Sequence, residues 1–304
     1  MILNAHKGQG VTIALAIVLF IGLAIRLSYL MINAGAPDFD SPVLDPQLND
    51  YWARALVTSD WSPPPHADDP QIRTTPYGRP PGYPWLLAAL YYLSNGSYVI
   101  PRIVQLLVGL INIILVFFLT KRLFNAQAGI AAAFLLSVYW AAVYFEGELN
   151  SPVWEVFLSL STVLILLRWE ERNHIFLLVL AGITLGAGVL LRPNVLLTGV
   201  FFTLWIFYIG YKRYGTSSKS IVRCGVFIIA CILTLAPALI RNYAVSGEFV
   251  LISYYGGINT YIGNNTEADG VSPTVPDLYE ISGSDQWNCF TYPHVVQGLG
   301  RYLK

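Results

Sequence analysis

The sequence is poor in charged residues, and this scarcity indicates its class. Charged residues make up only 12% of the 304 residues, whereas a soluble domain carries about 25%. Basic and acidic residues number 18 each, so the chain advertises no basic surface for nucleic acid. The three cysteines form no metal-ligand pair, which argues against a disulfide framework and a zinc site. No His, Asp and Glu cluster has ligand spacing either, so we expect no structural metal site and no cofactor, while a metal requirement is not indicated either way.

Internal repeats and low-complexity tracts do not stand out either. Apolar residues are abundant instead, at 55%, and the mean hydropathy is +0.54. They come in blocks long enough to cross a bilayer as helices, which takes about twenty residues. The first block is too long for the apolar core of a signal peptide, and no small-residue cleavage site follows it. We interpret it as a retained span.

Seven blocks have the length of a membrane span. They are Val11–Met31, Ile103–Thr120, Ala126–Phe145, Val153–Trp169, Ile175–Leu191, Val195–Tyr211 and Val222–Ile240. An eighth block, Pro81–Leu93, is too short to cross and is expected to be an interfacial or re-entrant helix. The expected fold is an all-α, polytopic transmembrane helix bundle over residues 1–241. It carries a long outer loop (34–80), and an outward-facing segment (242–304) follows it.

Lysine placement predicts the orientation. Four of the five lysines lie in the N-terminus or in short loops on one side: Lys7, Lys121, Lys212 and Lys219. Because such positively charged loops stay in the cytoplasm, both long polar stretches are expected to face the periplasm or its equivalent. We therefore expect a multi-pass protein of a bacterial inner membrane, with the lipid bilayer as its partner.

The outer loop holds the first candidates for acid–base chemistry. Asp45 and Asp50 lie among apolar and aromatic residues, and Asp50 to Val57 follow an amphipathic helical pattern. A partly desolvated carboxylate beside the membrane can take a proton from an acceptor hydroxyl or amine. For Asp68 and Asp69, among prolines, we favour simple solvation instead.

Three arginines are candidates for binding a lipid phosphate. Arg79 lies at a proline-rich break, and Arg192 and Arg241 lie where an apolar span meets the outer surface. A guanidinium fork fits phosphate oxygens, and fixed cations stabilise a departing phosphate. The alternative is that these long side chains only reach out to the lipid headgroups.

Four further charges lie near or inside the spans. Glu146 and Glu148 are expected in a short outward loop, either as a hydrated turn or as groups that orient the acceptor or the sugar. Glu155 lies one turn inside the next span, where hydration and function are equally plausible. Arg26, inside the first span, calls for a carboxylate partner that the sequence does not identify.

Several short motifs occur in an order found in a known family. These motifs are Leu44–Ala53, Arg79–Tyr92, Arg102–Leu107, Leu190–Asn194, Ile240–Tyr243, Gly247–Val250, Gly256–Asn259 and Gly263–Asn265. Together they resemble the first-loop, proline-led helix, Arg-Pro and outer-loop signatures of GT-C fold glycosyltransferases. The branch they resemble most is glycosyltransferase family 39 and its relatives, which include dolichyl-phosphate-mannose protein mannosyltransferases, lipid A aminoarabinose transferases and lipopolysaccharide-core galacturonosyltransferases. The resemblance covers roughly residues 10–266.

The resemblance implies an inverting glycosyltransferase that moves a sugar from a polyprenyl-phosphate donor. The acceptor would be a lipid, a polysaccharide or a protein on the outer face of the membrane. In this interpretation Asp45 is the general base and Asp50 is its helper or a structural neighbour. Arg192, Arg241 and Arg79 would hold the lipid phosphate.

Gly256, Gly257 and Asn259 are expected to shape the outer loop near the sugar, because glycine permits backbone conformations closed to other residues. Two rival functions remain. One is a transporter or flippase of lipid-linked substrates, although such proteins tend to show two related halves, which this sequence lacks. The other is an inactive, truncated glycosyltransferase, because the family usually carries more spans after its outer-loop signature. The sugar, the acceptor and the oligomeric state are not indicated.

Overall fold

The structure is a computed structural model that describes residues 2–63, 69–265 and 267–271. Every regular element within these ranges is a helix. The chain forms two compact units, Met1–Ser59 with Gly82–Thr234, and Asp60–Pro81 with Leu235–Lys304. We call them the first unit and the second unit.

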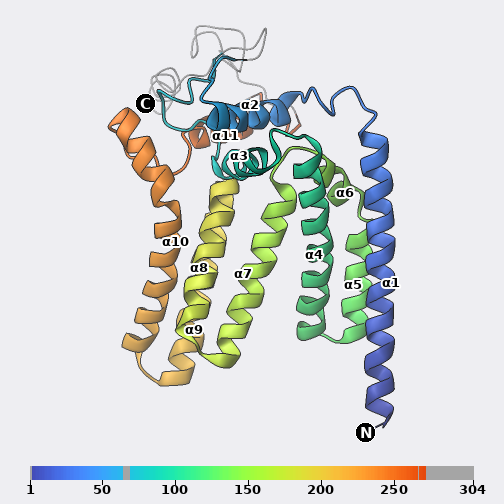
Figure 1. The fold of residues 1–304 in the computed structure, drawn as a ribbon. Helices are drawn as coiled ribbons and strands as arrows, with labels where there is room; N and C mark the ends of the chain where they lie inside the picture. Colours follow the sequence, from blue (N-terminus) through green and yellow to red (C-terminus); the bar gives the residue numbers. More distant parts are fainter. Residues whose placement is uncertain (1, 64–68, 266, 272–304) are drawn as a thin grey trace. The chain divides into compact units, whose positions relative to one another are not determined.

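Long apolar helices make up most of the first unit (Figure 1). Within the described ranges, five helices are long and apolar enough to cross a membrane. They are α1 (Ile2–Asn33), α4 (Val99–Leu123), α7 (Pro152–Arg172), α9 (Leu196–Tyr214) and α10 (Ser217–Ser246). A short 3-10 turn, η1 (Pro193–Val195), leads into α9, and the last residues of α10 belong to the second unit.

Two further predicted spans take other forms. α5 (Ala126–Val138) and α6 (Trp140–Gly147) meet at a bend of 51° and together have the length and composition of one span. α8 (Ile175–Leu191) is a shorter apolar helix of 17 residues. All seven predicted spans are thus helical, and the prediction of an all-α polytopic membrane protein is confirmed.

Large apolar side chains lie on the outside of these helices. Phe20, Phe201 and Leu233 are 71%, 65% and 66% exposed. Apolar surface on this scale is unfavourable in water, but hydrocarbon solvates it, and a helix satisfies its backbone polar groups internally. The outer faces of the helices therefore match a lipid environment.

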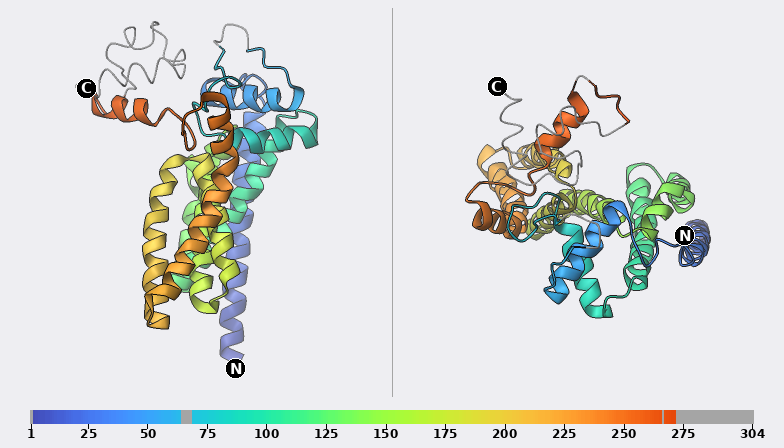
Figure 2. Two further views of the ribbon diagram at one scale, coloured as in Figure 1. Left: turned by 90° about the vertical axis from the view of Figure 1, so that its left-hand side faces the viewer. Right: turned by 90° about the horizontal axis from the view of Figure 1, so that it is seen from above.

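Two shorter helices lie across one end of the long helices of the first unit (Figures 1 and 2). These are α2 (Leu44–Thr58) and α3 (Gly82–Ser94). α3 matches the predicted short helix closely, whereas α2 begins six residues before the predicted start at Asp50, so that Asp45 is helical as well. A core of buried residues joins the two helices to the rest of the unit: Ala53, Tyr83, Leu87, Ala88, Tyr91, Leu149 and Leu191.

Glycine lets backbones approach closely in the first unit. A Cβ at Gly82 would lie 2.7 Å from the carbonyl of Leu190, so α3 and α8 touch through their main chains. A Cβ at Gly186 would lie 2.7 Å from Thr234 of α10. Small residues four positions apart permit this type of contact between membrane helices, and Gly182 stands four residues before Gly186.

The second unit is organised around Asn242, which is fully buried. Its side-chain oxygen accepts a hydrogen bond from the backbone N–H of Tyr77 at 3.0 Å. Its amide donates to the carbonyls of Val250 and Ile252, each at 3.0 Å. One side chain thus ties together segments that are far apart in the sequence. The unit also contains α11 (Gly256–Asn264), and most of the predicted outward-facing segment, 272–304, lies outside the described residues.

Candidate functional site

Asp50 is the centre of a polar network in the first unit. Its carboxylate accepts a hydrogen bond from the Tyr91 hydroxyl at 2.5 Å and one from the Tyr98 hydroxyl at 3.3 Å. Arg54, one turn further along α2, donates its Nε to both carboxylate oxygens at 2.9 and 3.1 Å. Burial and the nearby Asp50 charge raise the pKa of Tyr91 well above its ordinary value, so this phenol remains a donor.

Arg54 extends the network to the turn after α3. Its guanidinium lies over the rings of Tyr91 and Tyr98, at 4.6 and 4.4 Å from their centroids. It also donates to the carbonyl of Gly96 at 3.1 Å. Gly96 has a φ of +77°, a backbone conformation that residues other than glycine rarely adopt. The network therefore fixes α2 against α3, and Asp50 has the geometry of an anchoring residue.

Asp45 differs from Asp50 in its surroundings. It lies in the first turn of α2 and is exposed. An acidic group there interacts favourably with the positive end of the helix dipole. The preceding residue, Leu44, has a φ of +58°, which costs about 1–3 kcal/mol in a non-glycine residue. The anchored helix thus holds Asp45 at its exposed end.

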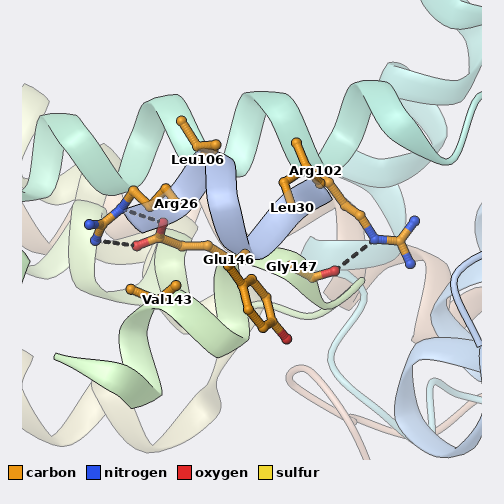
Figure 3. Close-up of a pocket in the computed structure, with 8 residues that line it drawn as sticks. Arg26, Leu30, Arg102, Leu106, Val143, Glu146 and Gly147 are labelled. Carbon is orange, nitrogen blue, oxygen red and sulfur yellow. Dashed lines mark hydrogen bonds and ion pairs between the residues drawn. The ribbon is translucent and has the colours of Figure 1, made fainter. Parts of the chain in front are cut away.

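Glu146 is part of a buried ion pair. The Arg26 guanidinium donates to its two carboxylate oxygens at 2.6 and 2.8 Å, and the two side chains are 1% and 4% exposed (Figure 3). Gly109 of α4 leaves the room that this carboxylate occupies. Arg26 also donates to the carbonyl of Ser137 at 3.0 Å, next to the bend between α5 and α6.

The expectation that Glu146 lies in a loop is therefore wrong. The helical run from Trp140 continues through Glu146 to Gly147 because Arg26 supplies the partner that a carboxylate needs at this depth. Glu146 is thus the carboxylate partner of Arg26 that the sequence alone did not identify. A cavity of about 10 Å³, at the lower limit for one water molecule, adjoins the pair.

Glu148 follows α6 directly and is outside the helix, as predicted. It is half-buried, and no described residue donates a hydrogen bond to its carboxylate. Burial raises its pKa above the ordinary value of 4.5, Arg102 lowers it, and Asp38 raises it further. Glu148 is thus a carboxylate in a mixed electrostatic environment that keeps hydrogen-bonding capacity for another group.

The main chain around Glu148 is held by side chains. Gln105 of α4 donates its amide to the carbonyls of Glu146 and Glu148, at 2.9 and 2.6 Å. Arg102, also on α4, donates to the carbonyl of Gly147 at 2.7 Å (Figure 3). Asn49 of α2 donates to the carbonyl of Leu149 at 2.9 Å. We call residues Glu146 to Leu149 the 146–149 segment.

Arg192 is an exposed cation at the end of α8. Its Nη1 lies 3.2 Å from a carboxylate oxygen of Glu155, and the two side chains are 60% and 14% exposed. Glu155 also accepts a hydrogen bond from the Ser151 hydroxyl at 2.6 Å. Pro193 ends α8 at this position, as the sequence predicts. Most of the Arg192 guanidinium therefore remains accessible.

Arg241 is bound within the second unit. It donates to the carbonyls of Ile72 and Thr75, and its guanidinium lies 4.1 Å from the centroid of the Tyr77 ring. These contacts occupy the fork that a phosphate would need. The predicted phosphate-binding role of Arg241 stays a prediction, but its side chain is engaged in holding residues 72–77.

The other predicted positions of the second unit are Arg79, Gly256, Gly257 and Asn259. Arg79 is half-buried. Gly256, Gly257 and Asn259 lie in α11, so the expectation that they shape a loop is wrong for their secondary structure. Gly256 does not have a positive φ, and the special conformational range of glycine is therefore not used there. Asn259 is exposed.

Sequence reasoning missed the polar residues of α4. Arg102, Gln105 and Asn112 are buried in an otherwise apolar span. Their spacing of three and seven residues places them on one helix face, and polar side chains inside a span have functional or structural partners by default. This periodicity was the signal that could have identified them. Asp50 and Arg54 gave a similar signal, because opposite charges four residues apart on a helix can pair.

No group of three or more His, Cys, Asp and Glu side chains in the described part of the chain could hold a metal ion.

A family model described as dolichyl-phosphate-mannose-protein mannosyltransferase matches residues 78–240, which is more than half of the chain. The match includes Arg79, Glu148 and Arg192. It begins C-terminal to α2, so it does not include Asp45. No curated protein and no solved structure matches.

Proposed function

Since the chain belongs to the dolichyl-phosphate-mannose-protein mannosyltransferase family, we propose that it moves a sugar from a polyprenyl-phosphate carrier to an acceptor, with inversion at the sugar carbon. Membership makes it a membrane glycosyltransferase of the GT-C type. The donor, the direction of attack and the outer face of the membrane as the place of reaction are parts of the proposal.

The proposed step is a single displacement. An oxygen or nitrogen of the acceptor attacks the anomeric carbon of the sugar, and the bond from that carbon to the phosphate oxygen breaks. The electron pair leaves with the polyprenyl phosphate, and the proton of the acceptor goes to a carboxylate. The protein must therefore supply a base near the acceptor and a cation near the phosphate.

We assign the base to Asp45. The supporting observation is that α2 is anchored through Asp50, Arg54 and Tyr91, while Asp45 stands exposed in its first turn. A base on a helix whose position is fixed by packing and hydrogen bonds is better oriented than one on an open loop. Asp50 then acts on catalysis only through the position of α2.

We assign the phosphate first to Arg192. Its guanidinium is largely exposed and, among the described residues, pairs with Glu155, whereas the guanidinium of Arg241 is occupied by backbone carbonyls. Arg79 remains a second candidate. A fixed guanidinium stabilises the negative charge that develops on the leaving phosphate.

We assign acceptor orientation to Glu148. Its carboxylate is half-buried and accepts no hydrogen bond from described residues, while both oxygens of Glu146 are bound by Arg26. An acceptor hydroxyl or amine can donate to Glu148 and thereby be held for proton transfer. Glu146 has no part in this proposal.

The decisive experiment measures label transfer from radiolabelled polyprenyl-phosphate sugars by membranes that contain the chain. Asp45→Asn should lower transfer at least about a hundredfold, because it removes the general base. Asp60→Asn is the matched control, since Asp60 is an exposed aspartate that accepts a hydrogen bond from Ser62. Transfer that survives in Asp45→Asn would remove Asp45 from this role. Movement of labelled lipid across the membrane without transfer would favour a flippase.

A further inference from the structure

The backbone of the 146–149 segment has an unusual set of partners. Each of its four carbonyls accepts a hydrogen bond from a side chain of another helix. The last carbonyls of a helix have no hydrogen-bond partner inside that helix. The carbonyls of Glu146 and Gly147, at the end of α6, therefore need partners from elsewhere. Glu148 and Leu149 follow the helix, and their carbonyls also receive side-chain donors, from Gln105 and Asn49 respectively. The hydrogen bonds there fix the backbone on both sides of the Glu148 side chain.

Gln105 holds two of these carbonyls. It is fully buried, and its amide group donates to the carbonyls of Glu146 and Glu148. Its own oxygen accepts a hydrogen bond from the Tyr83 hydroxyl at 2.7 Å. Both ends of the amide are thus engaged, which fixes its orientation. A buried amide with all its partners rigidifies its surroundings.

Arg102 holds the carbonyl between these two. Its three donor nitrogens go to the backbone carbonyls of Gly147, Tyr98 and Phe39, at 2.7, 2.8 and 3.0 Å. Its guanidinium also lies 3.9 Å from the centroid of the Phe39 ring. Among the described residues, Arg102 makes no ion pair with a carboxylate, so its charge acts on Glu148 without direct contact. It is 3% exposed and cannot reach a substrate without leaving these partners.

The Glu148 carboxylate is the one charged side chain of the 146–149 segment that has no hydrogen-bond donor in the described structure. Five groups from five different parts of the first unit interact with it electrostatically: Arg102 of α4, Asp38 of the loop after α1, Tyr29 of α1, Tyr83 of α3 and Tyr144 of α6. The backbone is fixed, and the carboxylate is available.

We propose that Gln105 and Arg102 are positioning residues that hold the 146–149 segment so that Glu148 presents its carboxylate to the acceptor. The inference rests on the proposed role of Glu148. It adds that two buried polar residues of the span α4 determine how the acceptor is oriented. Neither residue touches the substrate, and both act through the backbone of the segment.

The kinetic test compares Gln105→Leu with Asn112→Leu. Asn112 is also buried on α4 and donates to a backbone carbonyl at 2.9 Å, but that carbonyl belongs to Val153. We expect Gln105→Leu to lower kcat/KM for the acceptor about tenfold to a hundredfold with KM for the donor unchanged. Asn112→Leu should stay within about twofold for both substrates. Equal kinetic effects of the two substitutions would reduce Gln105 to a packing role and overturn the proposal.

Arg102 is tested through its charge. Arg102→Gln removes the cation that favours ionised Glu148, so the acidic limb of the pH–rate profile should move to higher pH. Arg102→Lys keeps the charge and loses the fork, so it should restore the limb while kcat/KM for the acceptor remains lowered. An unchanged acidic limb in well-folded Arg102→Gln contradicts the proposal.

A readout that needs no turnover separates this inference from the proposed function. The carboxyl band of Glu148 is identified in infrared difference spectra between the unsubstituted chain and Glu148→Gln, and it is followed through a pH titration. In Gln105→Leu the band should broaden, and in Arg102→Gln its midpoint should rise. If these changes appear in a chain that transfers no sugar, the proposed function fails and the positioning inference stands. If they are absent in folded protein, the inference fails.

Discussion

At the scale of single residues, Arg26 shows how a charge is kept inside an apolar helix. Its guanidinium is bound by Glu146 and by two backbone carbonyls, and it is 2% exposed. An ion pair excluded from water gains little net stability over apolar residues, because desolvation offsets the attraction. Removal of one partner is different, since it leaves the other charge buried and alone.

Arg26→Leu should therefore destabilise the chain by about 3–5 kcal/mol. The double variant Arg26→Leu, Glu146→Leu should recover most of this loss, because no lone charge remains. The free energy of unfolding in detergent micelles measures both. A double variant that is as unstable as the single one would show that Arg26 acts mainly through the carbonyls of Gly22 and Ser137.

Glu148 predicts a pH dependence of stability. Burial raises its pKa in the folded chain above 4.5, so the folded state binds the proton more tightly than the unfolded state. Its contribution to stability is fully present below the unfolded pKa and is lost as pH rises through the folded pKa. Glu148→Gln should lack this loss. The difference in Tm between this variant and the unsubstituted chain, measured from about pH 4 to about pH 8, should grow with pH. A constant difference would contradict the expectation.

At the scale of elements, the contact between α8 and α10 depends on glycine. A Cβ at Gly182 would meet the carbonyl oxygen of Phe227 and would lie 2.7 Å from the Cβ of Ala230. These atoms cannot give way without a shift of the helix, because the first is backbone. The two helices therefore owe their close approach to the missing side chain.

Gly182→Ala should cost about 1–3 kcal/mol of stability through overpacking. Gly225→Ala is the control, since a Cβ there meets nothing within 4 Å. The control should be neutral or stabilise by up to about 1 kcal/mol, because alanine favours helix. Thermal unfolding of the two variants in the same detergent gives the comparison. A similar loss in both would indicate that helix propensity, and not the contact, governs the result.

The sequence was sufficient to predict most of the helices. Apolar block length located the spans, and the boundaries of α8 agree with the prediction. The bend between α5 and α6 could not be predicted, because neither Pro nor Gly stands at Tyr139. The carbonyl of Ser137 beside the bend has a donor in Arg26, 111 residues earlier in the chain. A break that depends on such a distant partner leaves no local sequence pattern.

The candidate site was predictable in part for the same reason. The residue types and their places in the chain identified Asp45, Glu148 and Arg192 as candidates. The sequence could not distinguish Glu146 from Glu148, two residues apart, since only the fold brings Arg26 to one of them. It also could not show that the Arg241 guanidinium is occupied by the carbonyls of residues 72–75.

At the scale of the whole molecule, the two compact units have separate means of support. The first unit is held by helix packing and the Asp50 and Gln105 networks. The second unit depends on Asn242, whose side chain makes three hydrogen bonds to backbone groups. A change within one unit should therefore be felt mainly in that unit.

Asn242→Ala tests this separation. Amide exchange at Tyr77 should become at least about tenfold faster, because loss of a buried hydrogen-bond partner costs about 1–3 kcal/mol. Amides of α8 in the first unit should keep their exchange rates. Hydrogen exchange of this variant and of the unsubstituted chain measures both sets of amides at once. A uniform increase across both units would show that they open together.

The pairing of Arg26 with Glu146 also has a consequence for biosynthesis. The two residues are 120 positions apart, and a ribosome adds about 5–20 residues per second. About 6–24 s therefore separate the synthesis of the arginine from that of its carboxylate. During that interval an unpaired cation on α1 opposes insertion by about 2.5–3.5 kcal/mol. The remaining apolar residues of α1 must outweigh this opposition. The sequence of the first helix must therefore favour insertion without its partner as well as the final packing.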